Sequence, residues 1–248
     1  MAQLEIQHRR LTPNGTELHF VEAGPREGPL LILLHGFPEF WFAWRDYLAP
    51  FAAAGFHVVA PDQRGYNLSG KPKGVDAYRL DALADDIDGL ARLLGHSSFR
   101  VAGHDWGGLV AWWIATRQPS RLTHMAVLNA PHPAVWRRAM QRNPEQRKKS
   151  GYVRLLRLPW IPELAVRLGG YKGLAKAFDS ARPGAFSDTT LVSYDDAWRQ
   201  PGALTASLNW YRALFRQDMS VPDPGTLSTP CLVLWGDADA YWDPGARG

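Results

Sequence analysis

The sequence is poor in cysteine and has no long apolar run, and each absence excludes a class of protein. Its 248 residues contain one cysteine, Cys231, which rules out an intramolecular disulfide and a multi-cysteine metal site. Because Cys231 stands in the apolar run CLVLW, we expect a buried, unreactive thiol. The run LLILL is far too short to span a bilayer, and the N-terminus MAQLEIQHRR lacks the apolar core of a signal peptide. We therefore expect a cytoplasmic protein with no membrane insertion.

The sequence also lacks a strong excess of positive or negative charge. The net charge is +4, and no basic tract is interleaved with aromatic residues, so we expect no nucleic-acid partner. The basic run RKKS is typical of a solvated helix face. We also expect no cofactor and no metal ion. What the sequence does have in excess is tryptophan, eleven in all, a residue that fills cores and lines apolar pockets.

Short apolar runs recur along the chain and predict the fold class. The runs LLILL, HVVAP, FRVAG, HMAVL and CLVLW do not alternate with polar residues, which is typical of parallel strands covered on both faces. Helical patterns lie between the middle runs, as in 80–94, where an apolar stripe ends at Gly95. Two N-terminal strands, 4–12 and 17–24, precede them across a Pro-Asn-Gly turn. Alternating strands and helices predict a doubly wound α/β domain.

The alternation stops in the second half of the chain. Residues 134–217 are helical in pattern, punctuated by prolines, and contain no strand run. We therefore predict a core at 1–133, an inserted helical cap at 134–217 and a second part of the core at 218–248.

The segment VAGHDWGGLV, residues 101–110, has the pattern of a nucleophile elbow with Asp105 where serine usually stands. A serine that attacks a saturated carbon forms an ether, which nothing nearby can hydrolyse. A carboxylate forms an ester instead, and water can then attack its carbonyl carbon. An aspartate elbow therefore predicts displacement at saturated carbon: the opening of an epoxide or the expulsion of a halide. The expected oxyanion donors are the backbone N–H groups of Trp106 and of Phe37, in the loop HGFPEFW.

Other polar residues near these motifs have a structural interpretation. His35 opens the HGFPEFW loop, where a histidine is more often structural than catalytic. Asp62 and Arg64, in PDQRGYNLS, are expected to pair with each other and to tie loops together.

The motifs HGFPEFW, PDQRGYNLS, GHDWGG and LNAPHP occur in this order, and together they resemble the epoxide hydrolases of the α/β-hydrolase superfamily. The resemblance implies an α/β-hydrolase fold, with a mostly parallel sheet, antiparallel N-terminal strands and an inserted helical cap. It implies a small apolar epoxide as substrate and a vicinal diol as product.

The same resemblance implies further site residues. Two cap tyrosines would donate hydrogen bonds to the epoxide oxygen: Tyr152, seven residues before Pro159, and Tyr211, in the element NWYR. Tyr171 and Tyr194 are weaker candidates. The acid that orients the base matches Asp239, with Asp237 as its nearest competitor.

The sequence departs from the family in its histidines. The fold orders its catalytic residues as nucleophile, acid and histidine, yet none of the eight histidines lies beyond His132. His104 adjoins the nucleophile but is expected to point elsewhere, and His132 is interpreted as a loop anchor. We therefore expect a chain truncated at its C-terminus, without the last strand, the last helix and the base histidine. Such a chain would alkylate itself without turnover, and CLVLW would form an apolar sheet edge.

Two alternatives remain open at this point. A haloalkane or haloacid dehalogenase uses the same elbow, although the cap tyrosines favour the epoxide. A non-catalytic ligand-binding member of the fold would lack the base natively. No oligomeric state is predicted.

Overall fold

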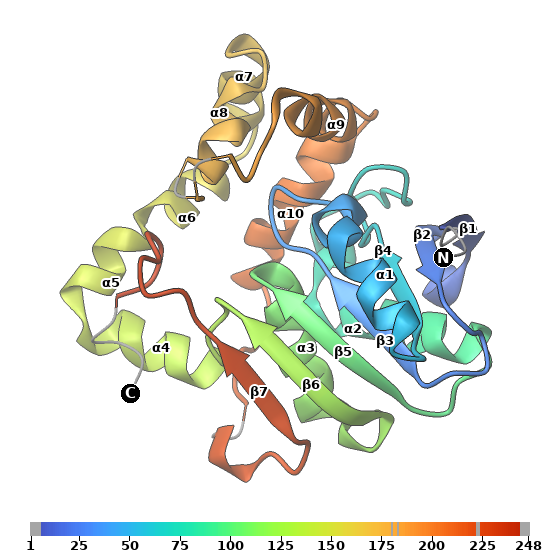
Figure 1. The fold of residues 1–248 in the computed structure, drawn as a ribbon. Helices are drawn as coiled ribbons and strands as arrows, with labels where there is room; N and C mark the ends of the chain where they lie inside the picture. Colours follow the sequence, from blue (N-terminus) through green and yellow to red (C-terminus); the bar gives the residue numbers. More distant parts are fainter. Residues whose placement is uncertain (1–5, 180, 183, 222–223, 244–248) are drawn as a thin grey trace.

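A seven-stranded sheet forms the centre of the protein (Figure 1). The computed structural model describes residues 6–179, 181–182, 184–221 and 224–243. The strand order is β1-β2-β4-β3-β5-β6-β7, in which β1 and β2 run antiparallel to their neighbours and the other pairs are parallel. The strands are β1 (Gln7–Leu11), β2 (Leu18–Ala23), β3 (Leu30–Leu34), β4 (His57–Pro61), β5 (Phe99–His104), β6 (Leu122–Leu128) and β7 (Cys231–Leu234). The predicted fold class, a mostly parallel sheet with antiparallel N-terminal strands, is confirmed.

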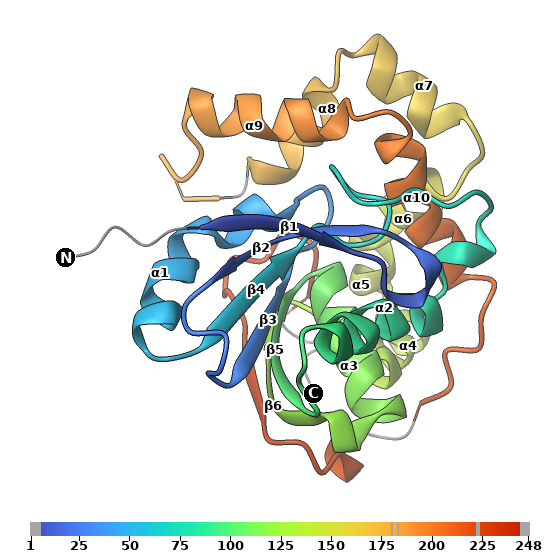
Figure 2. The same ribbon diagram turned by 90° about the vertical axis from the view of Figure 1, so that its right-hand side faces the viewer.

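The all-apolar sequence of β3 follows from the burial of both sheet faces. Leu30, Ile32 and Leu34 pack in one core cluster, and Leu31 and Leu33 pack in a second. The first cluster includes side chains of α2 (Leu80–Leu93) and α3 (Trp106–Arg117), and the second includes those of α1 (Arg45–Ala53). Figure 2 shows α1 on one side of the sheet and α2 and α3 on the other. Since side chains alternate between the faces of a strand, a strand buried on both faces must be apolar at every position.

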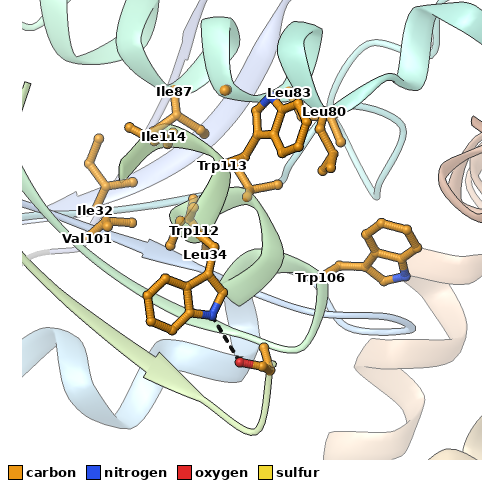
Figure 3. Close-up of a cluster of buried hydrophobic side chains, with 14 of the residues drawn as sticks. Ile32, Leu34, Leu80, Leu83, Ile87, Val101, Trp106, Trp112, Trp113 and Ile114 are labelled. Atoms are coloured by element: carbon orange, nitrogen blue, oxygen red, sulfur yellow. Dashed lines mark hydrogen bonds between the residues drawn. The ribbon is translucent and has the colours of Figure 1, made fainter. Parts of the chain in front are cut away.

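Tryptophans fix α3 in this core (Figure 3). The indole of Trp113 lies against Leu80 and Leu83 of α2, and its N–H donates to an Asp81 carboxylate oxygen at 2.7 Å. The indole N–H of Trp112 donates to the Ala130 carbonyl at 3.1 Å. Large indoles can be buried here because each polar N–H has an acceptor. The helix that begins at the elbow is thereby held rigidly.

Helices fill the segment in which the strand pattern stops. They are α4 (Pro133–Arg142), α5 (Pro144–Lys149), α6 (Gly151–Leu156), α7 (Ile161–Leu168), α8 (Lys172–Ala175), α9 (Asp188–Trp198) and α10 (Ala203–Leu214). The arrowheads of β5, β6 and β7 point toward this group of helices (Figure 1). The expected helical content is confirmed, and no strand occurs among the described residues of the segment. Its assignment as a cap, with boundaries at 134 and 217, stays a prediction.

Two tryptophans join these helices to the core. The indole N–H of Trp198, on α9, donates to the Pro38 carbonyl at 2.6 Å, and that of Trp210, on α10, donates to the Arg64 carbonyl at 3.0 Å. Part of the tryptophan excess therefore serves to dock one part of the chain on another.

The last described strand corrects one expectation. β7 pairs with β6 and ends the strand order, and all four of its side chains are exposed. The apolar edge expected of CLVLW is therefore present, but the expectation of a buried Cys231 is wrong. An apolar strand is buried only where other elements cover its faces, and this depends on tertiary neighbours that the run CLVLW does not report. Within the described part of the chain, no helix combines the length and the apolar character needed to cross a bilayer.

Candidate active site

Asp105 sits at the sharp turn between β5 and α3. Its backbone angles are φ 51° and ψ −118°, a sparsely populated conformation that costs on the order of 1–3 kcal/mol. Close packing around the turn maintains it: a Cβ added to Gly107 would lie 2.2 Å from the Leu34 carbonyl oxygen, and one added to Gly103 would lie 2.3 Å from the Gly107 oxygen. Only glycine fits at either position. The structure therefore has the strand–turn–helix context expected of a nucleophile elbow.

The carboxylate of Asp105 is held by two backbone amides. The Phe37 N–H donates to Oδ1 at 2.8 Å, and the Trp106 N–H also hydrogen-bonds the carboxylate. These are the two amides expected to form the oxyanion hole. Burial raises the pKa of the Asp105 carboxyl, and the neighbouring His104 cation and the two N–H groups counter only part of that rise.

The two expected tyrosines face the same cavity as the aspartate. A cavity of about 120 Å³ is lined by Asp105, Trp106, Tyr152 and Tyr211. Tyr152 comes from α6 and Tyr211 from α10, and their ring centroids are 6.4 Å apart. Burial raises the pKa of both hydroxyls, so both are protonated at neutral pH and can donate hydrogen bonds.

The weaker tyrosine candidates lie elsewhere. Tyr194 is buried in a separate cluster with Phe40 and Trp198, and Tyr171 lies under the Arg199 guanidinium. Neither lines the cavity.

Most of the cavity wall is apolar. This suits a ligand with few polar groups, oriented by a small set of polar contacts. Besides Trp106, the apolar lining residues are Leu109, Ala130, Pro131, Pro133, Trp136, Val153, Leu214, Met219, Trp235 and Trp242.

Asp239 is the acidic residue after β7 that reaches the cavity. Its Oδ2 accepts from the Asn129 side-chain amide at 2.6 Å, and its Oδ1 accepts from the Tyr241 N–H at 2.7 Å. Asp237 is not among the residues that line the cavity. The carboxylate of Asp239 therefore has a fixed orientation beside the space that Asp105 also faces.

Glu39, which the sequence did not single out, joins the elbow to the loop that carries Phe37. The Glu39 carboxylate accepts from His104 Nδ1 at 2.8 Å and from the Gly36 N–H at 3.1 Å. Burial lowers the pKa of His104, but the Glu39 carboxylate outweighs burial and raises that pKa to about 9. His104 is therefore a cation at neutral pH and cannot accept a proton as a general base. The acidic residue within HGFPEFW was the signal that could have revealed this pair.

Two structural interpretations can be compared with the observed contacts. His35 is buried, its Nδ1–H donates to the Gly36 carbonyl at 2.8 Å and its Nε2 accepts from the Gln63 N–H at 3.0 Å, which fits a structural role. The expected pairing of Asp62 with Arg64 is wrong. Arg64 binds Asp86 at 2.6 Å, and Asp62 binds His19 at 2.7 Å, because other elements bring these partners closer.

No histidine of the described chain lines the cavity. His132 stacks edge-on against Trp112 and caps α4 by accepting from the Ala134 N–H, in agreement with a role as loop anchor.

Comparison with known proteins identifies the family. The sequence profile of the family described as alpha/beta hydrolase fold matches residues 29–247. The AB hydrolase superfamily protein YfhM of Bacillus subtilis (strain 168) is 46% identical over 229 residues, which cover 92% of this chain and 80% of that protein. Epoxide hydrolase 4 of Homo sapiens is 38% identical over 241 residues, and the match spans 94% of this chain and 66% of that protein. A solved Bacillus megaterium epoxide hydrolase in complex with an inhibitor superposes with a TM-score of 0.85 at 30% identity, over 96% of this chain and 86% of that one.

The fold and these similarities define the chain as an α/β-hydrolase. Within that superfamily it belongs to the epoxide hydrolase family, as the order of its motifs indicated.

Proposed function

We propose that this protein opens small apolar epoxides to vicinal diols through a covalent ester on Asp105. One observation carries the proposal: a carboxylate fixed at a strained elbow by two backbone N–H groups faces an apolar cavity that also presents two protonated phenols. A carboxylate is the nucleophile suited to saturated carbon, and a phenol can stabilise the alkoxide that ring opening creates.

The first half of the reaction uses only residues seen in the cavity. A carboxylate oxygen of Asp105 attacks a ring carbon, a new C–O ester bond forms, and the C–O bond of the epoxide breaks. The electron pair goes to the ring oxygen, which takes a proton from the hydroxyl of Tyr152 or Tyr211. The product of this half is a hydroxyalkyl ester of the enzyme. The apolar wall keeps bulk water away from the epoxide during attack.

The second half hydrolyses that ester. Water attacks the carbonyl carbon of Asp105, and the amides of Phe37 and Trp106 stabilise the resulting oxyanion. Collapse of this intermediate breaks the ester C–O bond, gives the departing diol one proton of the water and leaves Asp105 as a carboxylate. The other proton of the water replaces the one that the tyrosine gave. The water must lose a proton to a base, and we propose that Asp239 orients this base. The fold uses a histidine after the acid, and none of the eight histidines of the chain occupies that place. We propose that the ester on Asp105 can be detected on the 248-residue chain after incubation with an epoxide.

The test is intact-mass spectrometry after incubation with a small aryl epoxide. We expect a mass increase of one epoxide, located by proteolysis on the peptide that contains Asp105. Asp105→Asn should abolish the adduct and the matched control Asp237→Asn should retain it. An unmodified chain, or an adduct on another residue, would refute the assignment of the nucleophile. Sustained diol production would instead show that a base is present.

A parallel assay with a haloalkane separates the proposed reaction from dehalogenation. Halide release without epoxide adduct formation would support a dehalogenase. The cytoplasmic location stays a prediction.

A further inference from the structure

The helix α7 buries its acidic side chain and exposes three large apolar ones. Glu163 is buried, whereas Ile161, Leu164 and Leu168 are 55%, 59% and 80% exposed. The spacing of i, i+3 and i+7 places these three side chains on one face of the helix. Trp160, directly before the helix, is 82% exposed. We call these four residues the α7 apolar stripe.

A buried ion pair holds α7 in this orientation. The Glu163 carboxylate lies 2.8 Å from the Arg212 guanidinium of α10, and Arg212 also donates to the Leu158 carbonyl at 2.7 Å. Both side chains of the pair are largely buried. Rotating the apolar stripe inward would expose Glu163 and leave the Arg212 charge buried without its partner, which is strongly unfavourable. The outward direction of the stripe is therefore a property of the packed structure.

The stripe lies at the periphery of the molecule. Both views show α7 at the far end of the helical segment, away from the sheet (Figures 1 and 2). A large exposed apolar surface at such a place is a recognised sign of an interaction site.

The sequence that flanks the stripe is basic. Between positions 151 and 176 it has a single acidic residue, the buried Glu163, against five basic ones. The basic residues are Arg154, Arg157, Arg167, Lys172 and Lys176. A surface groove next to the stripe is lined by Arg157 and Arg216 as well as by the Glu163–Arg212 pair, and it continues the basic character past the end of α10.

We propose that the α7 apolar stripe and its basic surroundings bind the surface of an anionic lipid bilayer. Such a surface offers acyl chains to the apolar side chains and anionic headgroups to the arginines and lysines. An exposed tryptophan beside a basic rim is suited to the headgroup level of a membrane. Binding of this kind is peripheral and requires no membrane-spanning helix.

A second copy of the chain is the competing occupant of this surface. A two-fold interface centred on the stripe would place the same basic residues of both copies against one another. Like charges at an interface oppose association, whereas an anionic surface is complementary to them. The charge distribution therefore favours the bilayer.

The test is flotation of the 248-residue chain with vesicles of phosphatidylcholine alone or mixed with phosphatidylglycerol. We expect binding to the mixed vesicles, weakened by salt, and little binding to phosphatidylcholine alone. The double variant R167Q/L168S should bind at least about tenfold more weakly, because it removes one charge and one inserted side chain. The double variant R92Q/L93S, which alters the same residue types in the last turn of α2, is the matched control and should bind as the wild type does.

Folding and self-association are measured on the same samples. Arg167 and Leu168 are exposed, so circular dichroism and the thermal midpoint should match the wild type. The proposal would be overturned if the chain did not bind anionic vesicles, or if it bound neutral vesicles equally well. It would also be overturned if both double variants lost vesicle binding to the same extent. Light scattering that shows a dimer dissociated by R167Q/L168S, without vesicle binding, would assign the stripe to a contact between copies. None of these results depends on the proposed chemistry of Asp105.

Discussion

Replacing Gly36 by alanine tests whether the loop that carries Phe37 positions Asp105, the proposed nucleophile. A Cβ at residue 36 would lie 2.5 Å from the Asp105 Cβ and 2.7 Å from its Oδ1. Real side chains do not approach so closely, so the loop or the elbow must move. The elbow has little freedom, because Asp105 is held at φ 51° by tightly packed glycines. The expected movement is therefore a displacement of the loop that carries Phe37.

The size of the effect follows from the position of the carboxylate, which the Phe37 N–H holds through a 2.8 Å hydrogen bond. Because Asp105 loses its charge as it attacks, this bond orients the carboxylate and does not lower the barrier by its own energy. A reacting group misplaced by about 1 Å can lose about 100-fold in rate, and we expect the alkylation rate to fall by about that factor. The inserted methyl group should also lower the free energy of unfolding by about 1–3 kcal/mol.

The assay is the initial rate of adduct formation, followed by intact-mass spectrometry well below the thermal midpoint of the variant. Gly173→Ala is the matched control, because a Cβ on Gly173 of α8 meets no atom within 4 Å. This variant should form the Asp105 adduct at the wild-type rate. If the folded Gly36→Ala variant also forms the adduct at that rate, the contact between loop and elbow does not position the carboxylate.

Three further predictions concern the cavity and the helix that borders it. Tyr152→Phe and Tyr211→Phe should each slow adduct formation by roughly 100-fold in the same mass assay, because each removes a proton donor; unchanged rates in both would contradict their role. Glu163→Gln should lower the free energy of unfolding in urea by about 3 kcal/mol, because it leaves the Arg212 charge buried without a counter-charge. Replacing both Glu163 and Arg212 by methionine should recover part of this loss. The alkylation rate should fall in acid as Asp105 is protonated. Because burial raises its pKa above the ordinary value, the fall should begin at a higher pH than for a free aspartate, and a pH–rate profile with an ordinary midpoint would show otherwise.

The parts of the site that could be predicted from the sequence are those that depend on local backbone geometry. A strand, a glycine-flanked turn and a helix in succession place Asp105 and the Trp106 amide by themselves. Phe37 follows from the loop after a neighbouring parallel strand, because such loops meet at one edge of the sheet. Tyr152 and Tyr211 needed the family resemblance, since no local pattern shows that α6 and α10 border the same cavity.

The parts that the sequence did not reveal depend on which elements become neighbours. In the sequence, Glu39 is one residue of a loop, and no local pattern shows that His104 lies beside it. Arg64 has an acidic residue two positions away in the sequence, yet it binds Asp86, because α2 packs over the loop after β4. The exposure of Cys231 likewise follows from the position of β7 at the end of the strand order. Side-chain partners and burial are tertiary properties, so apolar patterning alone does not determine them.

The buried ion pair between α7 and α10 and the exposed apolar stripe of α7 have a common explanation. Tyr211 and Arg212 are successive residues of α10, so they point to different sides of the helix: Tyr211 faces the cavity, and Arg212 binds Glu163. An ordinary helix at the place of α7 would bury its leucines and need no ion pair. A buried ion pair is often no more stable than apolar packing, and an exposed apolar stripe lowers solubility, so neither feature is favoured by stability alone. Their occurrence on the same helix is explained if the outward face of α7 has a binding role. The ion pair then does two things at once, because it keeps the stripe outward and braces the helix that carries Tyr211.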